Sequence, residues 1–503
     1  MYTNIIVWLI GIPLIASPFI YLLGRVAVRT ASTKAASLVS QLLSLLTLIA
    51  TWFAYGKTVS SFINNGSLYY SVGFIPLQVD GLSLLIGGMA LFLGTLVTIY
   101  SCSYMHGEDG EEKYYAMLLV IIGAMIGLGC AADLFNLWVW FEVMALSSYL
   151  LVSFYHDQAA ALEAGVKYLV QSAAGSALVL LGIALVFMET STLNLQAIQY
   201  IAYQTPMLLA GGALFIVGFG VKAAFVPMHT WLPDAHSQAP SGISALLSGV
   251  VIEAGLVALL RAIGALSNIT YSWGLLLMFF GVLNMIVGNL LALRQTQVKR
   301  LLAFSSLSHV GYMILGLGIA IDSGQVAGAA GGLFHLVNHG LMKGLAFLAV
   351  GALLYALHIA NGNHDAPLMV ADLAGVSRRY PLVAFTLSIG LLGLGGLPPF
   401  AGFMSKWQIF LAGIATHDQL IFWLVVIAAF NSVLSLGYYA PLVNAIYRHK
   451  PSATVVAGQR VPVGMQVPLV LLALAIVVLG LWPTLISWLT TPAGNAIMTT
   501  FGG

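Results

Sequence analysis

Residues 222–253 read KAAFVPMHTWLPDAHSQAPSGISALLSGVVIE. The stretch begins inside one long apolar segment and ends inside the next, with Lys222 in the first segment and Glu253 in the second. An ionisable side chain near the centre of a bilayer costs about 2.5–3.5 kcal/mol on insertion scales, so it is rare unless it serves a function. The stretch therefore indicates a membrane-spanning helical fold and marks the place where function is expected.

The composition excludes a soluble globular protein. Of the 503 residues, 60% are hydrophobic and 7% are charged, whereas soluble domains carry about 25% charged residues. The net charge of +2 gives no reason to expect a nucleic-acid partner. The two cysteines, Cys102 and Cys130, are too few for an iron–sulfur cluster, which normally needs four thiolates. We expect an all-α polytopic membrane protein with no cofactor in this chain.

Long apolar runs predict about fourteen transmembrane helices, since about 20 residues cross a bilayer as a helix. Pro227 lies inside the seventh run, and Pro398 and Pro399 lie inside the twelfth. Proline removes a helical hydrogen bond and clashes with the preceding turn, so we expect helices 7 and 12 to be broken. The predicted spans are 4–24, 35–55, 80–103, 114–132, 134–155, 166–188, 207–231, 241–261, 273–293, 299–320, 328–357, 380–413, 420–446 and 465–489.

Lysine and arginine are distributed unevenly between the two sets of loops. Thirteen, including Lys299, lie in loops that follow odd-numbered spans, and only Lys57 and Arg261 lie in the others. Short loops rich in basic residues stay in the cytoplasm. We therefore predict a multi-pass protein of the cell (inner or plasma) membrane with both termini on the outer face.

Two lysines suggest an internal repeat. Lys222 lies in the span broken at Pro227, and Lys406 lies five spans later in the span broken at Pro398 and Pro399. Because five is odd, the two units would have opposite orientations, and broken helices at matching places of inverted repeats indicate a transport site near the midplane. We predict helices 1–3 in 1–113, a first inverted five-helix repeat (helices 4–8) in 114–261, a second (helices 9–13) in 273–446, and helix 14 with a tail in 465–503.

Several ionisable residues lie within the predicted spans. Five of them, Glu142, Lys222, Glu253, Lys343 and Lys406, lie near the midplane, and Lys167 lies near a span end. Their summed cost would rival the stability of a whole fold, about 5–15 kcal/mol, so they must be hydrated or paired, and a chain of hydrated ionisable groups is a proton path. Burial weakens the hold of a lysine on its proton and a neighbouring carboxylate strengthens it. Lys222 and Glu142 could thus form a switch; a single structural ion pair is the alternative.

Histidines extend this set of residues. His335, His339 and Lys343 are spaced i, i+4 and i+8 and form one stripe on a helix, and His309 lies mid-span among serines, where it could bridge the two halves. Histidine relays protons readily near its ordinary pKa of about 6.5; packing of the helices is the alternative role. No third ligand has the spacing for a metal site, so no metal is expected. His229 and His236 flank the break and could be loop caps.

Five motifs carry a resemblance to a known family. In order along the chain, they resemble the antiporter-like subunits: the M/N-type subunits of complex I, their membrane-bound hydrogenase counterparts and the D-type subunit of Mrp antiporters. The likeness covers roughly residues 80–450. The motifs are FNLWVWFEVMALSSYLLV (135–152), VKAAFVPMHTWLPDAHSQAPSGISALLSG (221–249), QTQVKRLLAFSSLSHVGYMILG (295–316), HLVNHGLMKGLAFLAVGALLY (335–355) and GLPPFAGFMSKW (396–407).

The resemblance implies roles for these residues. Glu142 and Lys222 match the coupling ion pair of the family, Lys167 its sixth-helix lysine, and Lys406 the terminal lysine of N- and D-type members. His309 and the stripe from His335 through His339 to Lys343 match the central relay. One departure concerns Glu253, where much of the family has lysine; the carboxylate could partner a neighbouring basic group, or the path could be rewired.

The resemblance also implies a setting. The chain is expected to be a non-redox, proton-translocating subunit of an NADH-quinone oxidoreductase-like or hydrogenase-like translocase. Its partners would be other membrane subunits, including further antiporter-like ones, and peripheral redox subunits. The alternatives are a subunit of a Mrp-type Na⁺/H⁺ antiporter and a structural subunit with an inactive channel.

Overall fold

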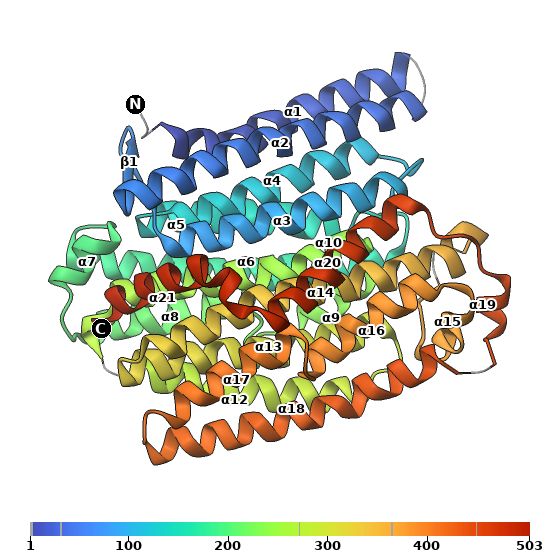
Figure 1. The fold of residues 1–503 in the computed structure, drawn as a ribbon. Helices are drawn as coiled ribbons and strands as arrows, with labels where there is room; N and C mark the ends of the chain where they lie inside the picture. The colour runs from blue at the N-terminus through green and yellow to red at the C-terminus, as the bar shows by residue number, and fades with distance from the viewer. Residues whose placement is uncertain (1–3, 31–32, 271, 364–365, 449, 503) are drawn as a thin grey trace.

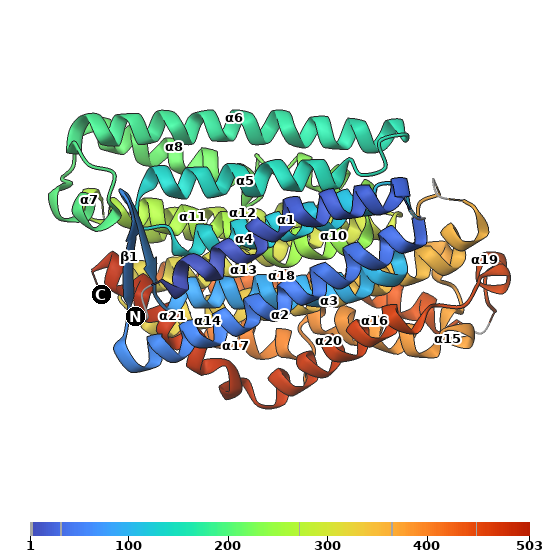
Figure 2. The same cartoon turned by 90° about the horizontal axis from the view of Figure 1, so that it is seen from above.

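The computed structural model describes residues 4–30, 33–270, 272–363, 366–448 and 450–502. Residues 1–3 and 503, at the ends of the first and last predicted segments, lie outside the described residues. The long helices run side by side in one bundle (Figure 1), and the two ends of the chain lie at the same end of that bundle in both cartoon views (Figure 2). The α-helices are α1 (Ile5–Thr30), α2 (Thr33–Asn65), α3 (Gly81–Tyr104), α4 (Glu111–Cys130), α5 (Leu134–Val152), α6 (Ala159–Thr190), α7 (Leu195–Ile201), α8 (Pro206–Lys222), α9 (Trp231–Gln238), α10 (Ser241–Leu246), α11 (Ile252–Ala265), α12 (Trp273–Ala292), α13 (Val298–Ser323), α14 (Val326–Leu357), α15 (Val376–Arg379), α16 (Pro381–Gly395), α17 (Ala401–Ile414), α18 (Gln419–Ile446), α19 (Ala453–Ala457), α20 (Val463–Leu481) and α21 (Ser487–Phe501).

Within the described residues, twelve helices are long and apolar enough to cross a membrane. Two shorter apolar helices, α8 and α16, have 17 and 15 residues. The prediction of an all-α polytopic membrane protein is confirmed at this level. The helix α10–α11 counts as one of the twelve, and a π-helical segment at Leu247–Val251 joins its two parts.

A β-hairpin and a C-terminal helix are among the elements that were not predicted. A short antiparallel hairpin, β1 (Leu68–Val72) and β2 (Ile75–Val79), pairs Leu68 with Val79 and turns at Gly73, whose φ of 60° suits glycine. Helix α21 follows the last predicted span and packs against α3 and α14. It was missed because its 15 residues, with an internal proline and several threonines, are too short and too polar to be read as a span.

Both predicted helix breaks are present. Helix α8 ends at Lys222, before Pro227, and the chain becomes helical again at Trp231. The amide N–H of Val226 donates to the side chain of Asn284 (2.8 Å), whose amide donates back to the carbonyl of Ala224 (3.2 Å). These bonds satisfy backbone groups that the break frees inside the protein. The second break separates α16, which ends at Gly395, from α17, which begins at Ala401.

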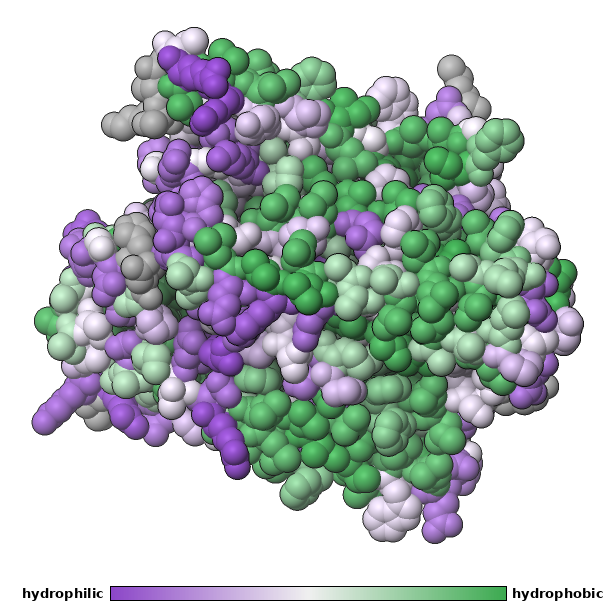
Figure 3. All heavy atoms as spheres, turned by 180° about the vertical axis from the view of Figure 1, so that it is seen from behind, coloured by the Kyte–Doolittle hydropathy of each residue, from purple (hydrophilic) through white to green (hydrophobic). Residues whose placement is uncertain are grey.

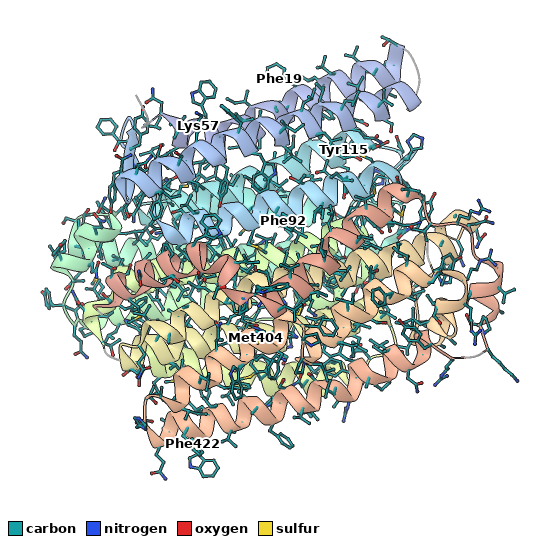
Figure 4. The ribbon with its side chains drawn as sticks, viewed as in Figure 1. Phe19, Lys57, Phe92, Tyr115, Met404 and Phe422 are labelled. Carbon is teal, nitrogen blue, oxygen red and sulfur yellow. The ribbon has the colours of Figure 1, made fainter. Side chains whose placement is uncertain are left out.

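The outer surface of the bundle is largely apolar, and its apolar core encloses a set of buried polar and ionisable side chains. The outer faces of α1, α2, α6, α12 and α18 expose large apolar side chains, and Figure 4 shows Phe19 and Phe422 projecting outward from α1 and α18. Much of the face shown in Figure 3 is apolar. Helix α14 lies at the centre, packed against α13, α16, α17 and α20, and it carries buried histidines and a lysine. Buried ionisable groups need polar partners, so the interior of the bundle is where a site is sought.

A buried ion pair anchors α11 to the start of α3. Asp80 caps α3 by accepting a hydrogen bond from the amide N–H of Ser83 (2.8 Å), and its carboxylate also binds the guanidinium of Arg261 (2.9 and 3.2 Å). Arg261 further donates to the hydroxyl of Ser83 and the carbonyl of Gly129. The prediction of Arg261 as an outer loop residue is wrong: it is 8% exposed within α11, because four acceptors satisfy its charge there.

Candidate functional site: a buried polar axis

A cluster of histidines occupies the centre of the bundle. Nδ1 of His309, on α13, lies 3.1 Å from Nε2 of His335, on α14, and Nδ1 of His335 lies 2.8 Å from the hydroxyl of Ser405, on α17. The hydroxyl of Tyr439 lies 3.4 Å from Nε2 of His309. Both histidines are at most 1% exposed. Hydrogen bonds at both ring nitrogens allow each imidazole to take a proton on one side and release it on the other.

Glu253 joins this cluster from α11. Its Oε1 lies 2.8 Å from Nδ1 of His339, and both side chains are fully buried. The ring of His339 stacks against that of His309, with centroids 5.3 Å apart. Gly249 permits the approach, since a Cβ there would lie 3.0 Å from the carbonyl oxygen of Gly340 on α14. Glu253, His339, His309 and His335 thus form a continuous line of contacts.

Lys343 lies one helical turn beyond His339. Its ammonium donates to the carbonyl of Leu302 (2.7 Å) and to the hydroxyl of Ser305, so neutral groups of α13 bind the charge. His236 is fully buried, stacks on Phe347 (4.8 Å between centroids) and lies within electrostatic range of Lys343. Within the described residues, neither ring nitrogen of His236 has a hydrogen-bond partner. His236 therefore lies inside the bundle, and its side chain does not cap a loop.

Lys406 lies at the far end of the histidine line. It follows Ser405, the partner of His335, and its ammonium donates to the carbonyl of Leu394 (3.1 Å) and the hydroxyl of Ser432 (3.0 Å). Its Nζ also lies 4.7 Å from the ring centroid of Tyr312. The Leu394 carbonyl is available because α16 ends one residue later, so the helix break itself supplies an acceptor for the charge.

Lys222 is the last residue of α8 and is fully buried. Its ammonium donates a hydrogen bond to the hydroxyl of Tyr168 on α6. Glu142 acts on Lys222 electrostatically, but within the described residues no ion pair of 4.0 Å or less joins them, and Oε1 of Glu142 is buried without a hydrogen-bond partner. The two groups matched to a coupling pair are therefore near each other but separated.

Lys167 lies away from the buried axis. Its side chain is 51% exposed and forms ion pairs with Glu163 (2.7 Å) and Asp234 (3.1 Å), and Asp234 also binds Arg300. Burial raises the pKa of the Asp234 carboxyl, but the hydrogen bonds and charges of Arg300 and Lys167 outweigh this and hold it below its usual range. The structure groups Lys167 with this surface network and not with the histidine line.

A polar cavity of about 410 Å³ reaches Lys299. Its lining includes Tyr104 and Leu354, near the ends of α3 and α14, together with Tyr155, Ser237 and Gln238. Lys299 was predicted in a loop, yet it is 4% exposed and donates to the carbonyl of Ala239 (2.6 Å), because α13 already begins at Val298. Lys299 also lies within electrostatic range of His236. The cavity thus reaches Lys299 from the end of the bundle, and neither His236 nor Lys343 lines it.

Comparison with known proteins identifies the family. A family model described as NADH:quinone oxidoreductase/Mrp antiporter, TM, matches residues 131–435, and one for the N-terminus of chain 5 of NADH-ubiquinone oxidoreductase (complex I) matches residues 62–115. The chain belongs to this family. It is an antiporter-like, proton-translocating membrane subunit of this class, and the recognition made from the five motifs is confirmed.

Relatives of this antiporter-like subunit cover most of its length. The F(420)H(2) dehydrogenase subunit N of Methanosarcina mazei is 33% identical, over 88% of this chain and 90% of the relative. The NADH-quinone oxidoreductase subunit N of Moorella thermoacetica is also 33% identical, over 82% of this chain and 84% of the relative. Among solved structures, a chain of the membrane-bound sulfane sulfur reductase, an archaeal respiratory membrane complex, superposes with a TM-score of 0.84 at 29% identity and covers 99% of both chains.

In this antiporter-like subunit Tyr168 was not predicted as a site residue, and neither His236 nor Lys299 was predicted to lie on the path. A signal for Tyr168 was available, since the small residues Ala164, Ser172 and Gly175 recur on one face of α6. Position 168 shares that face, whereas position 167 points about 100° away. That periodicity predicts Tyr168 inward and Lys167 outward, as the structure has them. No comparable pattern distinguishes His236, whose burial depends on α14.

Proposed function

We propose that the bundle contains fourteen membrane spans, including two inverted five-helix repeats, with the segment boundaries predicted above. The twelve long helices together with the two broken ones support this number. The lysines support the inversion: Lys222 is the last residue of the helix before its break, whereas Lys406 lies in the helix after its break. Two units of opposite orientation would place their charged groups on opposite sides of their breaks.

We further propose that the protein resides in the cell membrane with both termini on the outer face. The basic loops support this orientation. The two termini lie at one end of the bundle, and α15, which carries Arg378 and Arg379, lies at the other (Figure 1).

We propose that protons move along the line from Lys222 and Glu142 through Glu253, His339, His309 and His335 to Lys406, with Lys343 beside it. One observation carries this proposal: Glu253, His339, His309, His335 and Ser405 form a buried series that ends next to Lys406. Polar contacts of 3.1 Å or less join successive members of the series except His339 and His309, whose rings stack with centroids 5.3 Å apart. Gly255 supports the link at the other end, because a Cβ there would lie 3.1 Å from the backbone carbon of Lys222, so α11 packs directly on the end of α8.

The cavity at Lys299 would supply protons from the cytoplasmic side. Between the cavity and the centre, the successive ionisable groups are Lys299, His236 and Lys343. The charges of both lysines act on His236. In this proposal Lys167 stays near the uptake side as part of the surface network with Asp234 and Arg300. A neighbouring membrane subunit would cover that network, since exposed charges within a membrane-spanning helix need partners.

The protein would work inside a multi-subunit complex of the complex I or hydrogenase type. In this proposal the chain itself performs no redox step, and peripheral partner subunits carry the electrons. The alternative is a Mrp-type Na⁺/H⁺ antiporter subunit. Transport that is driven by an imposed ΔpH and Na⁺, without an electron donor, would favour this alternative.

The test is proton pumping by inverted membrane vesicles that contain the whole complex. We expect Lys222→Ala and Glu142→Ala to abolish pumping while native gels still show the assembled complex. Lys57→Ala is the matched control, because Lys57 is exposed on α2, where its ammonium lies over the ring of Phe53. Normal proton uptake by either axis variant would overturn the proposal.

A further inference from the structure

Tyr168 lies on the buried face of α6, one residue after the exposed Lys167. Its hydroxyl accepts a hydrogen bond from the ammonium of Lys222, and Nζ of Lys222 lies 4.5 Å from the centroid of its ring. A cation within about 6 Å of an aromatic centroid is attracted by the ring. Within the described residues, Tyr168 provides both the hydrogen bond and the cation–π contact of the Lys222 ammonium.

Trp231 fixes the position of Tyr168. The two rings stack with centroids 4.0 Å apart and planes 5° apart, and both side chains are at most 1% exposed. Trp231 is the first residue of α9, and its indole N–H donates to the carbonyl of Val221, the residue before Lys222 (2.7 Å). Tyr168 is therefore held against both sides of the helix break, and its hydroxyl has a fixed position relative to the end of α8.

Glu142 competes for the same ammonium. Phe141 packs edge-to-face on Phe219, one turn before Lys222, with centroids 5.1 Å apart, so α5 passes the end of α8 closely. Glu142 acts on Lys222 electrostatically, yet its buried Oε1 has no hydrogen-bond partner within the described residues. The flexible side chain of Lys222 thus has two acceptors nearby, the hydroxyl of Tyr168 on α6 and the carboxylate of Glu142 on α5. Its ammonium is bound to the hydroxyl.

We propose that Tyr168 is a positioning residue whose hydroxyl holds Lys222 apart from Glu142 and so sets how readily Lys222 releases its proton. The inference rests on the proposed function, in which Lys222 carries the proton. A neutral hydroxyl stabilises an ammonium less than a carboxylate does. Lys222 bound to Tyr168 therefore gives up its proton more readily than Lys222 paired with Glu142, and movement of its side chain between the two acceptors is the switch.

The test compares Tyr168→Phe with the wild type in the assembled complex. Phenylalanine keeps the ring that stacks on Trp231 and removes only the hydroxyl. We expect Lys222 to pair with Glu142 in this variant, and pumping near pH 7 to fall. The pH at which pumping reaches half its maximum should rise by about one unit, which corresponds to a tenfold change in the deprotonation equilibrium of Lys222. Tyr55→Phe is the control, because the buried hydroxyl of Tyr55 donates to the carbonyl of Leu84 on α3 (2.8 Å) and not to a residue of the proposed path.

The structure of the Tyr168→Phe complex gives a second readout. We expect Nζ of Lys222 within ion-pair distance of the Glu142 carboxylate. An unchanged pH profile, or an unmoved Lys222, would overturn the inference. If Tyr168→Phe fails to assemble, Trp231→Phe takes its place: it keeps a ring for stacking but frees the Val221 carbonyl, and it should shift the profile in the same direction.

Lys222→Ala, measured in parallel, separates the two proposals. Full pumping by Lys222→Ala would defeat the proposed function itself. Loss of pumping in Lys222→Ala together with a wild-type profile in Tyr168→Phe would defeat only the role of Tyr168.

Discussion

Oε1 of Glu253 lies 2.8 Å from Nδ1 of His339, and neither side chain is exposed to solvent. The resemblance suggested lysine at position 253, so a carboxylate there raised the question of a rewired path. The structure gives that carboxylate a basic partner on the neighbouring helix α14. A buried charge is tolerated when it is paired and hydrogen-bonded, and a carboxyl and an imidazole in contact can share one proton.

Glu253→Gln tests whether this contact carries protons. Glutamine keeps the size and a hydrogen bond to His339 but cannot titrate. We expect proton pumping in inverted vesicles to fall at least about tenfold, equivalent to a barrier about 1.4 kcal/mol higher, while the complex still assembles. The control Glu163→Gln makes the same change at a side chain that is 66% exposed. Full pumping by Glu253→Gln would remove this link from the path.

Lys343→Met distinguishes a working relay from a structural subunit with an inactive channel. Methionine fills a similar volume but leaves the carbonyl of Leu302 and the hydroxyl of Ser305 without a charged donor. We expect pumping to be lost while native gels show the complex intact. Lys57→Met makes the same chemical change at an exposed site. If Lys343→Met lowers thermal stability and nothing else, the inactive-channel alternative is correct.

Lys167→Gln tests whether the sixth-helix lysine belongs to the path. Because its side chain is half exposed and bound to Glu163 and Asp234, we expect the variant to retain more than about half of wild-type pumping; exposed ion pairs contribute little. Lys222→Ala measured beside it should be inactive. Equal loss in both variants would return Lys167 to the axis.

Asp80→Asn tests the anchor between α3 and α11. Removing one partner of a buried ion pair costs about 3–5 kcal/mol, so we expect a lower thermal unfolding temperature of the detergent-solubilised complex. Burial acts to raise the pKa of Asp80, but Arg261 and the hydrogen bonds of Ser83 outweigh it and lower the pKa. The stabilisation is therefore fully present above the unfolded value of about 3.9 and is lost only as pH falls through the lower folded value. The unfolding temperatures of wild type and variant should differ by the same amount from pH 5 to 9. If this difference disappears within that range, the ion pair is not its cause.

Much of the fold follows from patterns within single helices. Apolar length predicted the spans, and the prolines with nearby lysines predicted both breaks, because these are properties of one segment of chain. The 4-residue spacing of His335, His339 and Lys343 likewise predicted a shared stripe on α14, which is buried along its length.

Contacts between distant segments were not predictable in this way. The pairing of Glu253 with His339, the hydroxyl of Tyr168 as partner of Lys222 and the burial of Lys299 depend on which faces of α6, α11, α13 and α14 meet. A single sequence indicates which face of each helix is polar, but it does not indicate which other helix packs against that face. Lys167 is a different case, because the small residues on one face of α6 already indicate that its side chain points outward.

His236→Phe tests the route from the Lys299 cavity to the centre. Phenylalanine keeps the stacking on Phe347 but removes both ring nitrogens, which have no hydrogen-bond partner within the described residues, so no hydrogen bond shown by the structure is lost and the fold should be unaffected. If protons pass from Lys299 through His236 to Lys343, pumping should fall at least about tenfold, a barrier about 1.4 kcal/mol higher. The control His156→Phe makes the same change at a side chain that is 62% exposed. Wild-type pumping by His236→Phe would show that protons reach Lys343 by another way and leave His236 with a packing role.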